Sequence, residues 1–404
     1  MKRLIPILTA LALAGCGGGP ALEVGVTPAE LKPIEQPDVA VQGLWAAELD
    51  RTGRHYLQLR PVAGDGRVFA VDHTGHVYAY RAEGGDEIWQ TRVGSRVSGG
   101  LGDGGKLLLM GGDAEVMAVT KADGAVRWRA EVSSEVLAPP VRSGDVVVVR
   151  TIDGGVYGLA AGDGRQLWEY RQETPLLTLR GNSAPAVADG TAVIGSDNGR
   201  LVALDLDSGK KLWEQAVSVP RGRTDLERMA DVDGRIVIRD HVVYAASYQG
   251  RLVAVSLNDG GMLWTRDLSS HTGVAAAADA LYAVDERADL WALATRNGAS
   301  LWRQTALHGR RLSAPTVQGD YLVVGDLEGY LHWVDRADGH LAARARLLDR
   351  DEFFPVKDAE EGADENPYPE NRSLLAAPVV VGDRVYALDQ RGVLNAFRVR
   401  PQSR

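Results

Sequence analysis

A repeated pair of short strand patterns constrains the fold of this chain more than any other feature of its sequence. The first pattern is a glycine or alanine followed by alternating apolar residues, and copies of it begin at positions 75, 114, 154, 199, 250, 288, 329 and 392. The second pattern is a turn containing Asp-Gly, Asn-Gly or Ser-Gly, followed by a strand that ends in Trp. Such turns between alternating residues are strong signals for β-hairpins. The sequence therefore predicts a tandem array of antiparallel hairpins.

The spacing of the tryptophans indicates the size of each repeat. Six of them, which end the second pattern, lie at positions 89, 128, 168, 213, 264 and 302. Further short strands, often preceded by Ala-Pro, lie upstream of each hairpin. Four strands in about 40 to 45 residues is the size of a β-propeller blade. A tryptophan at one phase of every blade is expected to pack between neighbouring blades.

The two ends of the chain carry incomplete copies of the repeat. The alternating pattern occurs eight times, but after the copy at 329 the Trp position is held by Ala343, and after the copy at 392 the sequence stops. An isolated QGLWAAEL, containing Trp45, lies near the N-terminus without strand partners before it. Closure by this strand would remove the exposed edges of an open sheet. We therefore predict an all-β, eight-bladed β-propeller over residues 39–404, with four antiparallel strands per blade and the ring closed by the N-terminal strand.

The first residues resemble a bacterial lipoprotein signal. A short apolar run within residues 1–15 is too short to span a membrane and is typical of a signal peptide. It leads into Leu-Ala-Gly-Cys, which resembles a lipobox, so Cys16 is the predicted site of lipidation. Because Gly17 follows in place of aspartate, the outer membrane is favoured, with the protein facing the periplasm. Residues 16–38, rich in Gly and Pro, are predicted to form a flexible tether.

The charge of the chain argues against nucleic acid as a partner. Removal of the signal peptide, which contains Lys2 and Arg3, changes the formal net charge from −9 to −11. Phosphate recognition relies on a basic surface instead. Cys16 is the only cysteine, so no disulfide can form within one chain.

Motifs that carry chemistry are absent or better explained as turns. Residues 100–105, GLGDGG, match a dinucleotide fingerprint, but a strand and not a helix follows them, so a hairpin turn is predicted. His73 and His76 lie in another turn without further ligands nearby. The Asp-x-Asp pairs at 205–207 and 231–233 lack the longer ligand series of a calcium loop. We therefore expect no catalytic residue, no metal and no cofactor.

Three long connections interrupt the period, at residues 171–184, 216–235 and 344–376. Each follows a Trp strand or its degenerate copy, so all three are expected on one face of the disc. The first contains Leu176, Leu177, Leu179 and Arg180, and apolar anchors beside arginine are typical of protein–protein hot spots. The same residues also allow Leu177 and Leu179 to alternate into the core and Arg180 to be solvated, and the pattern leaves both interpretations open.

The lipobox, the repeats and the N-terminal closing strand together resemble the BamB family, the lipoprotein subunits of the outer-membrane β-barrel assembly machinery. The most specific stretches are LTLRG at 177–181, with SAP after it, and MADVDG at 229–234. The resemblance implies a non-enzymatic scaffold that contacts the periplasmic POTRA domains of the central barrel subunit. It implies that Leu177, Leu179 and Arg180, with Asp231 and Asp233 beside them, form this contact. The acidic insertion at 349–370 departs from the family pattern.

Two other classes share the repeat. Pyrroloquinoline-quinone propeller enzymes have similar blades, so a quinone-dependent periplasmic dehydrogenase is the main alternative. Such enzymes are larger than this chain, bind calcium and often contain a disulfide between adjacent cysteines, whereas Cys16 is the only cysteine here. A carbohydrate- or peptidoglycan-binding propeller is the third class, because the aromatic residues alone are compatible with it.

Overall fold

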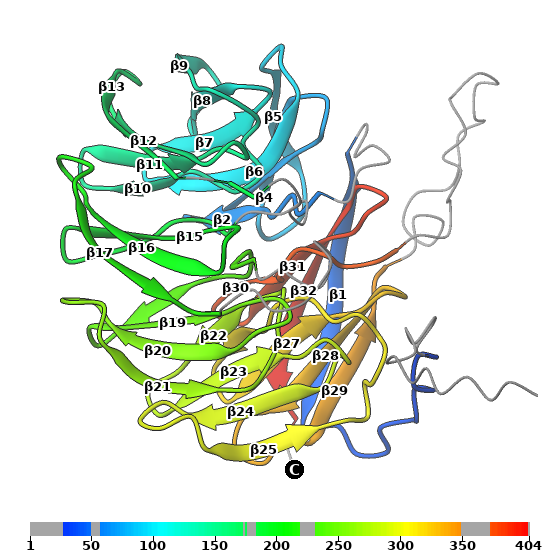
Figure 1. The fold of residues 1–404 in the computed structure, drawn as a ribbon. Helices are drawn as coiled ribbons and strands as arrows, with labels where there is room; N and C mark the ends of the chain where they lie inside the picture. The colour runs from blue at the N-terminus through cyan, green and yellow to red at the C-terminus, as the bar shows by residue number, and fades with distance from the viewer. Residues whose placement is uncertain are drawn as a thin grey trace, which may run out of the picture.

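The computed structural model describes residues 27–49, 57–172, 174–175, 183–218, 231–348 and 372–402, and every regular element within them is a β-strand. These strands form eight four-stranded antiparallel sheets, which we number as blades 1 to 8 (Figure 1). The described part of the chain contains no helix that is long and apolar enough to cross a membrane.

Each of the first seven blades is built from four consecutive strands. Blade 1 comprises β2 (Val62–Gly64), β3 (Arg67–Val71), β4 (His76–Arg81) and β5 (Glu87–Arg92), and blade 2 comprises β6 (Val97–Gly104), β7 (Leu107–Gly112), β8 (Glu115–Thr120) and β9 (Val126–Glu131). Blade 3 comprises β10 (Val141–Ser143), β11 (Val146–Arg150), β12 (Gly155–Ala160) and β13 (Gln166–Arg171), and blade 4 comprises β14 (Ala186–Ala188), β15 (Thr191–Gly195), β16 (Arg200–Asp205) and β17 (Lys211–Ala216).

The second half of the ring repeats this plan until the last blade, which takes one strand from each end of the chain. Blade 5 comprises β18 (Val237–Arg239), β19 (Val242–Ala246), β20 (Leu252–Ser256) and β21 (Met262–Arg266), and blade 6 comprises β22 (Val274–Ala276), β23 (Ala280–Val284), β24 (Leu290–Ala294) and β25 (Ser300–Gln304). Blade 7 comprises β26 (Thr316–Gln318), β27 (Tyr321–Gly325), β28 (Tyr330–Asp335) and β29 (Leu341–Arg346), and blade 8 comprises β30 (Val379–Val381), β31 (Arg384–Leu388), β32 (Val393–Pro401) and β1 (Val39–Glu48).

The ring is closed. The first strand of each blade contacts the first strand of the next, and β30 of blade 8 contacts β2 of blade 1. Within blade 8, β1 pairs with β32 from Val39 opposite Pro401 to Glu48 opposite Val393, with a bulge at Gly43 and Trp45. Figure 1 shows blue β1 beside red β32. The predicted eight-bladed propeller and its closure by the N-terminal strand are confirmed.

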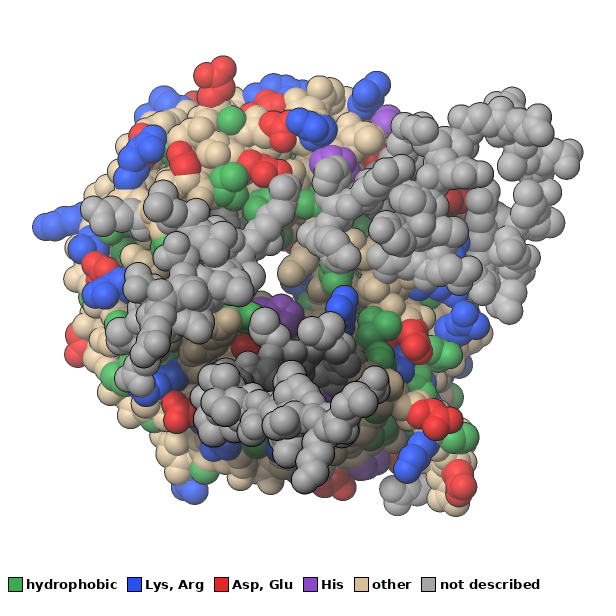
Figure 2. Space-filling view, turned by 45° about the vertical axis from the view of Figure 1, so that its right-hand side comes forward, with side chains coloured by type: hydrophobic (Ala, Val, Ile, Leu, Met, Phe, Trp, Pro, Cys, Tyr) green, Lys and Arg blue, Asp and Glu red, His purple; other side chains and the backbone are tan. Residues whose placement is uncertain are grey.

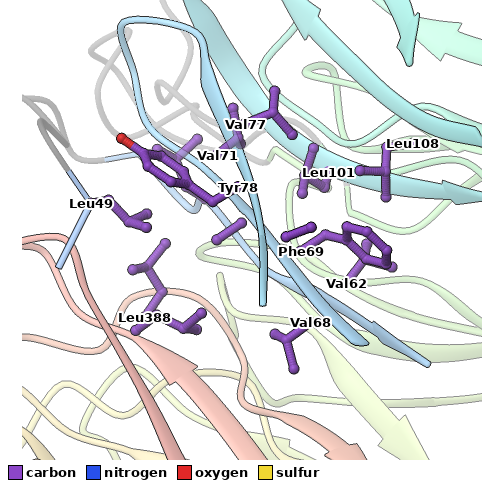
Figure 3. Close-up of a cluster of buried hydrophobic side chains, with 14 of the residues drawn as sticks. Leu49, Val62, Val68, Phe69, Val71, Val77, Tyr78, Leu101, Leu108 and Leu388 are labelled. Carbon is purple, nitrogen blue, oxygen red and sulfur yellow. The ribbon is translucent and has the colours of Figure 1, made fainter. Parts of the chain in front are cut away.

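Buried apolar side chains fill the space between blades. The largest cluster joins blades 8, 1 and 2, and includes Leu388 of β31, Phe69 of β3 and Leu108 of β7 (Figure 3). Similar clusters occur between the other blades. Alternation along each strand therefore supplies both faces of a blade with apolar side chains, as the repeated pattern predicts.

Seven tryptophans join successive blades, as expected from their phase. Each indole Nε1 donates a hydrogen bond to a backbone carbonyl of the next blade; the pairs are Trp45–Ala82, Trp89–Lys121, Trp128–Ala161, Trp168–Leu206, Trp213–Leu257, Trp264–Thr295 and Trp302–Arg336. Each indole also covers a turn glycine of that blade, where a Cβ atom would lie 2.5–2.8 Å from the ring. The sequence repeat thus records an inter-blade contact.

The exception at Ala343 has a structural reason. Elsewhere a small residue of the third strand pairs with the tryptophan of the fourth, for example Ala292 with Trp302. In blade 7 the sizes are exchanged, because Trp333 of β28 pairs with Ala343 of β29. The next blade is blade 8, in which β32 and β1 come from opposite ends of the chain. No covalent turn joins them, so a tryptophan at 343 would have no turn glycine to cover.

Residues 27–38 lie against blade 7 before the chain enters β1. The Ala29 amide donates to the His308 carbonyl at 2.8 Å, and the Asp38 amide donates to the Ala342 carbonyl at 2.9 Å. Leu31 packs against the apolar cluster between blades 6 and 7. The flexible tether assigned to 16–38 stays a prediction for residues 16–26, which, like the predicted signal peptide, lie outside the described residues.

Candidate functional site

The connections between blades begin and end on one face of the disc. In four-stranded antiparallel blades, the link from the fourth strand to the next blade leaves on the same side as the turn between the second and third strands. We call this side the loop face. The long connections at 171–184, 216–235 and 344–376 follow β13, β17 and β29, so all three begin on it, as the sequence predicts.

The predicted contact residues of the first connection lie outside the described residues. These are Leu177, Leu179 and Arg180, and the acidic insertion 349–370 is outside them as well. Their predicted roles therefore stay predictions. The residues that flank the gaps are described, and they show where two of the connections rejoin the propeller.

The first and second connections rejoin the propeller at one point. A Cβ atom on Gly195, the last residue of β15, would lie 2.7 Å from the Ser183 Oγ and even closer to the Val232 carbonyl oxygen. Ser183 lies close to the end of the first connection and Val232 close to the end of the second, and both residues are buried. Glycine is required here because no side chain fits between the two segments. The two sequence stretches most specific to the resemblance thus meet at their bases.

A buried charge cluster lies at this junction. It consists of Arg150 at the end of β11, Asp197 in the turn after β15, and Asp231 and Asp233 before β18, and all four side chains are less than a tenth exposed. Arg150 donates from Nη2 to Asp197 Oδ1. Its Nη1 lies 3.9 Å from Asp233 Oδ1. One guanidinium therefore links blades 3, 4 and 5.

The cluster contains more carboxylates than cations. Burial raises the pKa of Asp233 to about 8; Arg150 opposes this shift, whereas the carboxylates of Asp197 and Asp231 add to it. Neither oxygen of Asp233 has a hydrogen-bond partner within the described part of the chain. At neutral pH this carboxyl group therefore holds a proton, which reduces its repulsion with the carboxylates of Asp197 and Asp231.

The burial of the aspartates changes how they can take part in an interface. Asp231 is 1% exposed, and its carbonyl accepts a hydrogen bond from the Tyr248 amide. The Asp233 side chain is 7% exposed. These side chains do not line the open surface of the loop face. They lie where the connections leave the disc, so they are placed to position the segments that flank the gaps.

Sequence reasoning selected two members of this cluster and missed the other two. The family resemblance implies Asp231 and Asp233, whereas their spacing alone indicates no site. Arg150 and Asp197 belong to other blades, and only the fold brings them together. One signal was present, since Arg150 is a charged residue that ends the fully buried strand VVVVR.

A second charged feature surrounds the axis of the ring. Arg60 precedes β2 of blade 1, and Arg235 precedes β18 of blade 5, so they approach the axis from opposite blades of the loop face. Burial and the positive charge of Arg235 lower the pKa of Arg60 to about 10. The molecule is hollowed at its centre (Figure 2). Two arginines from opposite blades therefore bring positive charge close to the axis on the loop face.

The turns that resembled ligand sites are structural. Residues 100–105 lie in β6 and its turn to β7, as predicted for a hairpin. The His76 Nδ1 lies 3.1 Å from Asp72 Oδ2, and the amide of His76 donates to Asp72 Oδ1, so this pair orders the turn after β3. The His73 Nδ1 lies 3.3 Å from the Val97 carbonyl oxygen.

Comparison with known proteins gives a consistent set of relatives. The family model described as outer membrane protein assembly factor BamB matches residues 42–101 and 94–304. The BamB of Alkalilimnicola ehrlichii is 40% identical over 400 residues, which cover 98% of this chain and 97% of that protein. The BamB of Yersinia pestis is 34% identical over 407 residues, which cover 98% of each chain.

Solved structures add a match at the level of the fold. The crystal structure of BamB from Moraxella catarrhalis has a TM-score of 0.76 at 28% identity and covers 89% of this chain and 100% of that one. A quinohemoprotein alcohol dehydrogenase from Pseudomonas putida has a TM-score of 0.68 at 11% identity, covering 90% of this chain and 77% of that one. The latter similarity shows the propeller fold alone.

Proposed function

Because this chain belongs to the BamB family of outer membrane protein assembly factors, we propose that it is a non-enzymatic scaffold subunit of the outer-membrane protein assembly machinery. The observation that carries the proposal is the meeting of two long connections at one buried charge cluster on the loop face. A scaffold needs a rigid base for its binding loops, and the Arg150 cluster ties three blades together at that base.

We propose that Leu177, Leu179 and Arg180 contact the periplasmic POTRA domains of the central barrel subunit. Apolar anchor residues with an arginine beside them are typical of a hot spot in a protein–protein interface. In this proposal Asp231 and Asp233 support the contact from within the propeller, because both side chains are buried and Asp233 lies beside Arg150. Docking would hold the POTRA domains in orientations that help deliver unfolded outer-membrane proteins to the barrel. The work of the protein is therefore positioning and not bond chemistry.

Exposed leucines on the rim of the disc favour a second way in which this protein could aid the assembly of outer-membrane proteins. The outermost strands of blades 3 to 6 each present a leucine one residue before the tryptophan: Leu167, Leu212, Leu263 and Leu301, exposed by 38%, 50%, 55% and 54%. An extended apolar segment of an unfolded outer-membrane protein could pair with such an edge by β-augmentation. This route uses the rim and leaves the loop face to the central subunit.

We place the protein at the outer membrane, facing the periplasm. The lipobox predicts a diacylglyceryl group on Cys16, and multiple acyl chains would give a stable anchor where a single chain gives only a marginal one. The names of the relatives, which describe assembly of the outer membrane, support this location.

An Arg180→Ala variant tests the docking contact. Truncation of a hot-spot arginine costs about 2 kcal/mol or more of binding free energy. We therefore expect the variant to recover much less of the central barrel subunit when it is purified from membranes. Arg165→Ala is the matched control, because Arg165 is exposed in the turn between β12 and β13 of blade 3, on the face opposite the loop face. Unchanged recovery with Arg180→Ala, measured by mass spectrometry, would contradict the proposed contact.

A further inference from the structure

The segment at residues 27–38, which we call the strap, is held against blade 7 near both of its ends and in its middle. At its beginning, the Ala29 amide donates to the His308 carbonyl, and Arg310 Nη1 donates to the Ala29 carbonyl at 3.0 Å. In its middle, Leu31 packs between blades 6 and 7. The strap therefore combines backbone hydrogen bonds with apolar burial, and it is attached before β1 begins.

The cation that holds the start of the strap belongs to a buried network. Arg310 is 2% exposed; its Nε donates to Asp326 Oδ2 at 2.8 Å, and its Nη2 donates to Glu328 at 2.6 Å. His332, fully buried, lies with Nε2 2.9 Å from Asp326 Oδ2. Burial lowers the pKa of His332, so the ring is neutral and its Nε2–H donates to Asp326. These contacts within the propeller hold the Arg310 guanidinium in the position from which it binds the strap.

A second arginine continues the same network towards the strap. Arg344 of β29 donates from Nε to His332 Nδ1 at 3.3 Å, which the neutral ring leaves free to accept. Its Nη1 donates to the carbonyl of Lys32 at 3.0 Å. Two arginines connected through Asp326 and His332 therefore bind two strap carbonyls, three residues apart. The two arginines therefore supply hydrogen-bond donors at positions that match the carbonyl groups of an extended backbone.

The other end of the strap is held at the turn between β28 and β29. His340 lies between two carboxylates, with Nε2 2.7 Å from Asp38 and Nδ1 2.6 Å from Asp338. Burial lowers the pKa of His340, but the hydrogen bonds to Asp338 and Asp38 outweigh it, so the pKa is raised. The strap thus crosses the outer edge of blade 7, from the loop face at His308 to the turn at His340.

We infer that the strap makes blade 7 the side of the disc that faces the membrane. The inference rests on the proposed lipid anchor at Cys16. A chain free as far as residue 38 could reach about 75 Å from Cys16, whereas attachment at Ala29 shortens the reach to about 45 Å. The anchor then acts at one point of the ring, beside His308, and this edge of the disc is held closer to the lipid than the opposite edge.

This arrangement separates the two surfaces of the protein. The connections at 171–184 and 216–235 lie at the junctions of blades 3 and 4 and of blades 4 and 5. Blade 7 is three blades from blade 4 around the ring. The membrane side and the proposed docking site therefore occupy different sectors of the ring, so anchoring and docking do not use the same blades.

Hydrogen exchange on the whole lipidated chain tests the attachment of the strap. We expect slow exchange at the amides of Ala29 and Asp38, whose carbonyl partners lie on blade 7. Leu31→Asp places a charge in the apolar contact, and the Ala29 amide should then exchange at least about tenfold faster. Glu35→Gln is the matched control, because Glu35 is an exposed strap residue. Fast exchange of Ala29 in the unmodified sequence would overturn the attachment, whatever the state of Cys16.

Fluorescent labels at opposite points of the ring test the orientation. Arg287→Cys and Asp113→Cys change exposed residues in equivalent turns of blades 6 and 2, and the Arg287 carbonyl accepts from the Gly309 amide beside the strap. On phosphatidylethanolamine–phosphatidylglycerol vesicles containing a nitroxide-headgroup lipid, we expect stronger quenching at 287 than at 113, and loss of this difference with Leu31→Asp. Equal quenching at both sites, or a difference that survives Leu31→Asp, would overturn the orientation. Failure of the chain to bind vesicles would instead overturn the lipid anchor.

Discussion

The contact repeated around this ring is between an indole and a glycine of the next blade. The indole donates its Nε1–H to a carbonyl and lies flat on the turn glycine, as Trp168 does with Leu206 and Gly209. Two separate features of this position require glycine. Its φ is positive, at 69° for Gly209, and a Cβ atom there would lie 2.6 Å from the indole. Each pair thus combines backbone geometry with packing, and the glycine and the tryptophan depend on each other.

A Gly209→Ala substitution measures this dependence. We expect it to lower the free energy of unfolding by about 2–4 kcal/mol, the sum of the strain at positive φ and the overpacking against Trp168. Gly190→Ala is the matched control, because Gly190 also has a positive φ of 72° in blade 4 but has no atom within 4 Å of its Cβ position. Chemical denaturation should give the larger loss for Gly209→Ala. Equal losses would mean that backbone strain alone accounts for the glycine.

Among the strands, β1 is the one that reaches its blade without a covalent turn to its partner. It is held by its pairing with β32, by Trp45, which is buried against Gly85 and Ala82 of blade 1, and by the strap on the other side. The exchange of Trp333 and Ala343 shows that blade 7 is adapted to this join. Closure therefore depends on side chains that face two neighbouring blades.

A Trp45→Ala substitution should loosen the closing strand. We expect a loss of about 3–5 kcal/mol in the free energy of unfolding, as for other large buried aromatics. The amides of β1 should also exchange faster, because Trp45 donates a hydrogen bond that joins this strand to blade 1. Trp302→Ala is the control: it removes an equivalent indole from β25, a strand joined to β24 by a covalent turn. If β1 in Trp45→Ala exchanges as slowly as β25 in Trp302→Ala, the indole is not what holds the closure.

On the scale of the whole molecule, the proposed docking sector and the proposed anchoring sector each contain a cluster of buried charged groups. Arg150 links blades 3, 4 and 5 where the connections at 171–184 and 216–235 rejoin the propeller. Arg310 and Arg344 hold the strap on blade 7. The cores of the blades are apolar and almost interchangeable. The buried ion clusters are specific to particular blades, so they distinguish one part of the ring from another.

The excess of carboxylates beside Arg150 should make stability depend on pH. Since folding raises the pKa of Asp233 to about 8, the folded state binds the extra proton, and its stability falls as the pH rises from the unfolded pKa towards 8. This group contributes a slope of up to about 1.4 kcal/mol per pH unit in that range. Asp233→Asn should remove the slope, so the variant gains relative to the parent between pH 5 and pH 8. Denaturation midpoints at three pH values measure it.

The exposed Asp207→Asn substitution is the control for that experiment, because its side chain lies outside the cluster. It should leave the pH dependence of the parent unchanged. A slope for Asp233→Asn equal to that of the parent would show that the carboxyl group of Asp233 is not the source.

The amino-acid sequence by itself determined the blade, the number of blades and the closure, because each is recorded locally by alternation, turn glycines and tryptophans at one phase. It also placed the long connections on one face, since strand order alone decides where a connection emerges. Only the tertiary structure decided that Asp231 and Asp233 are buried with Arg150 and Asp197, and that residues 27–38 lie on blade 7. These contacts join residues far apart in the chain, and their partners follow from how the blades are arranged around the ring, which no local pattern records.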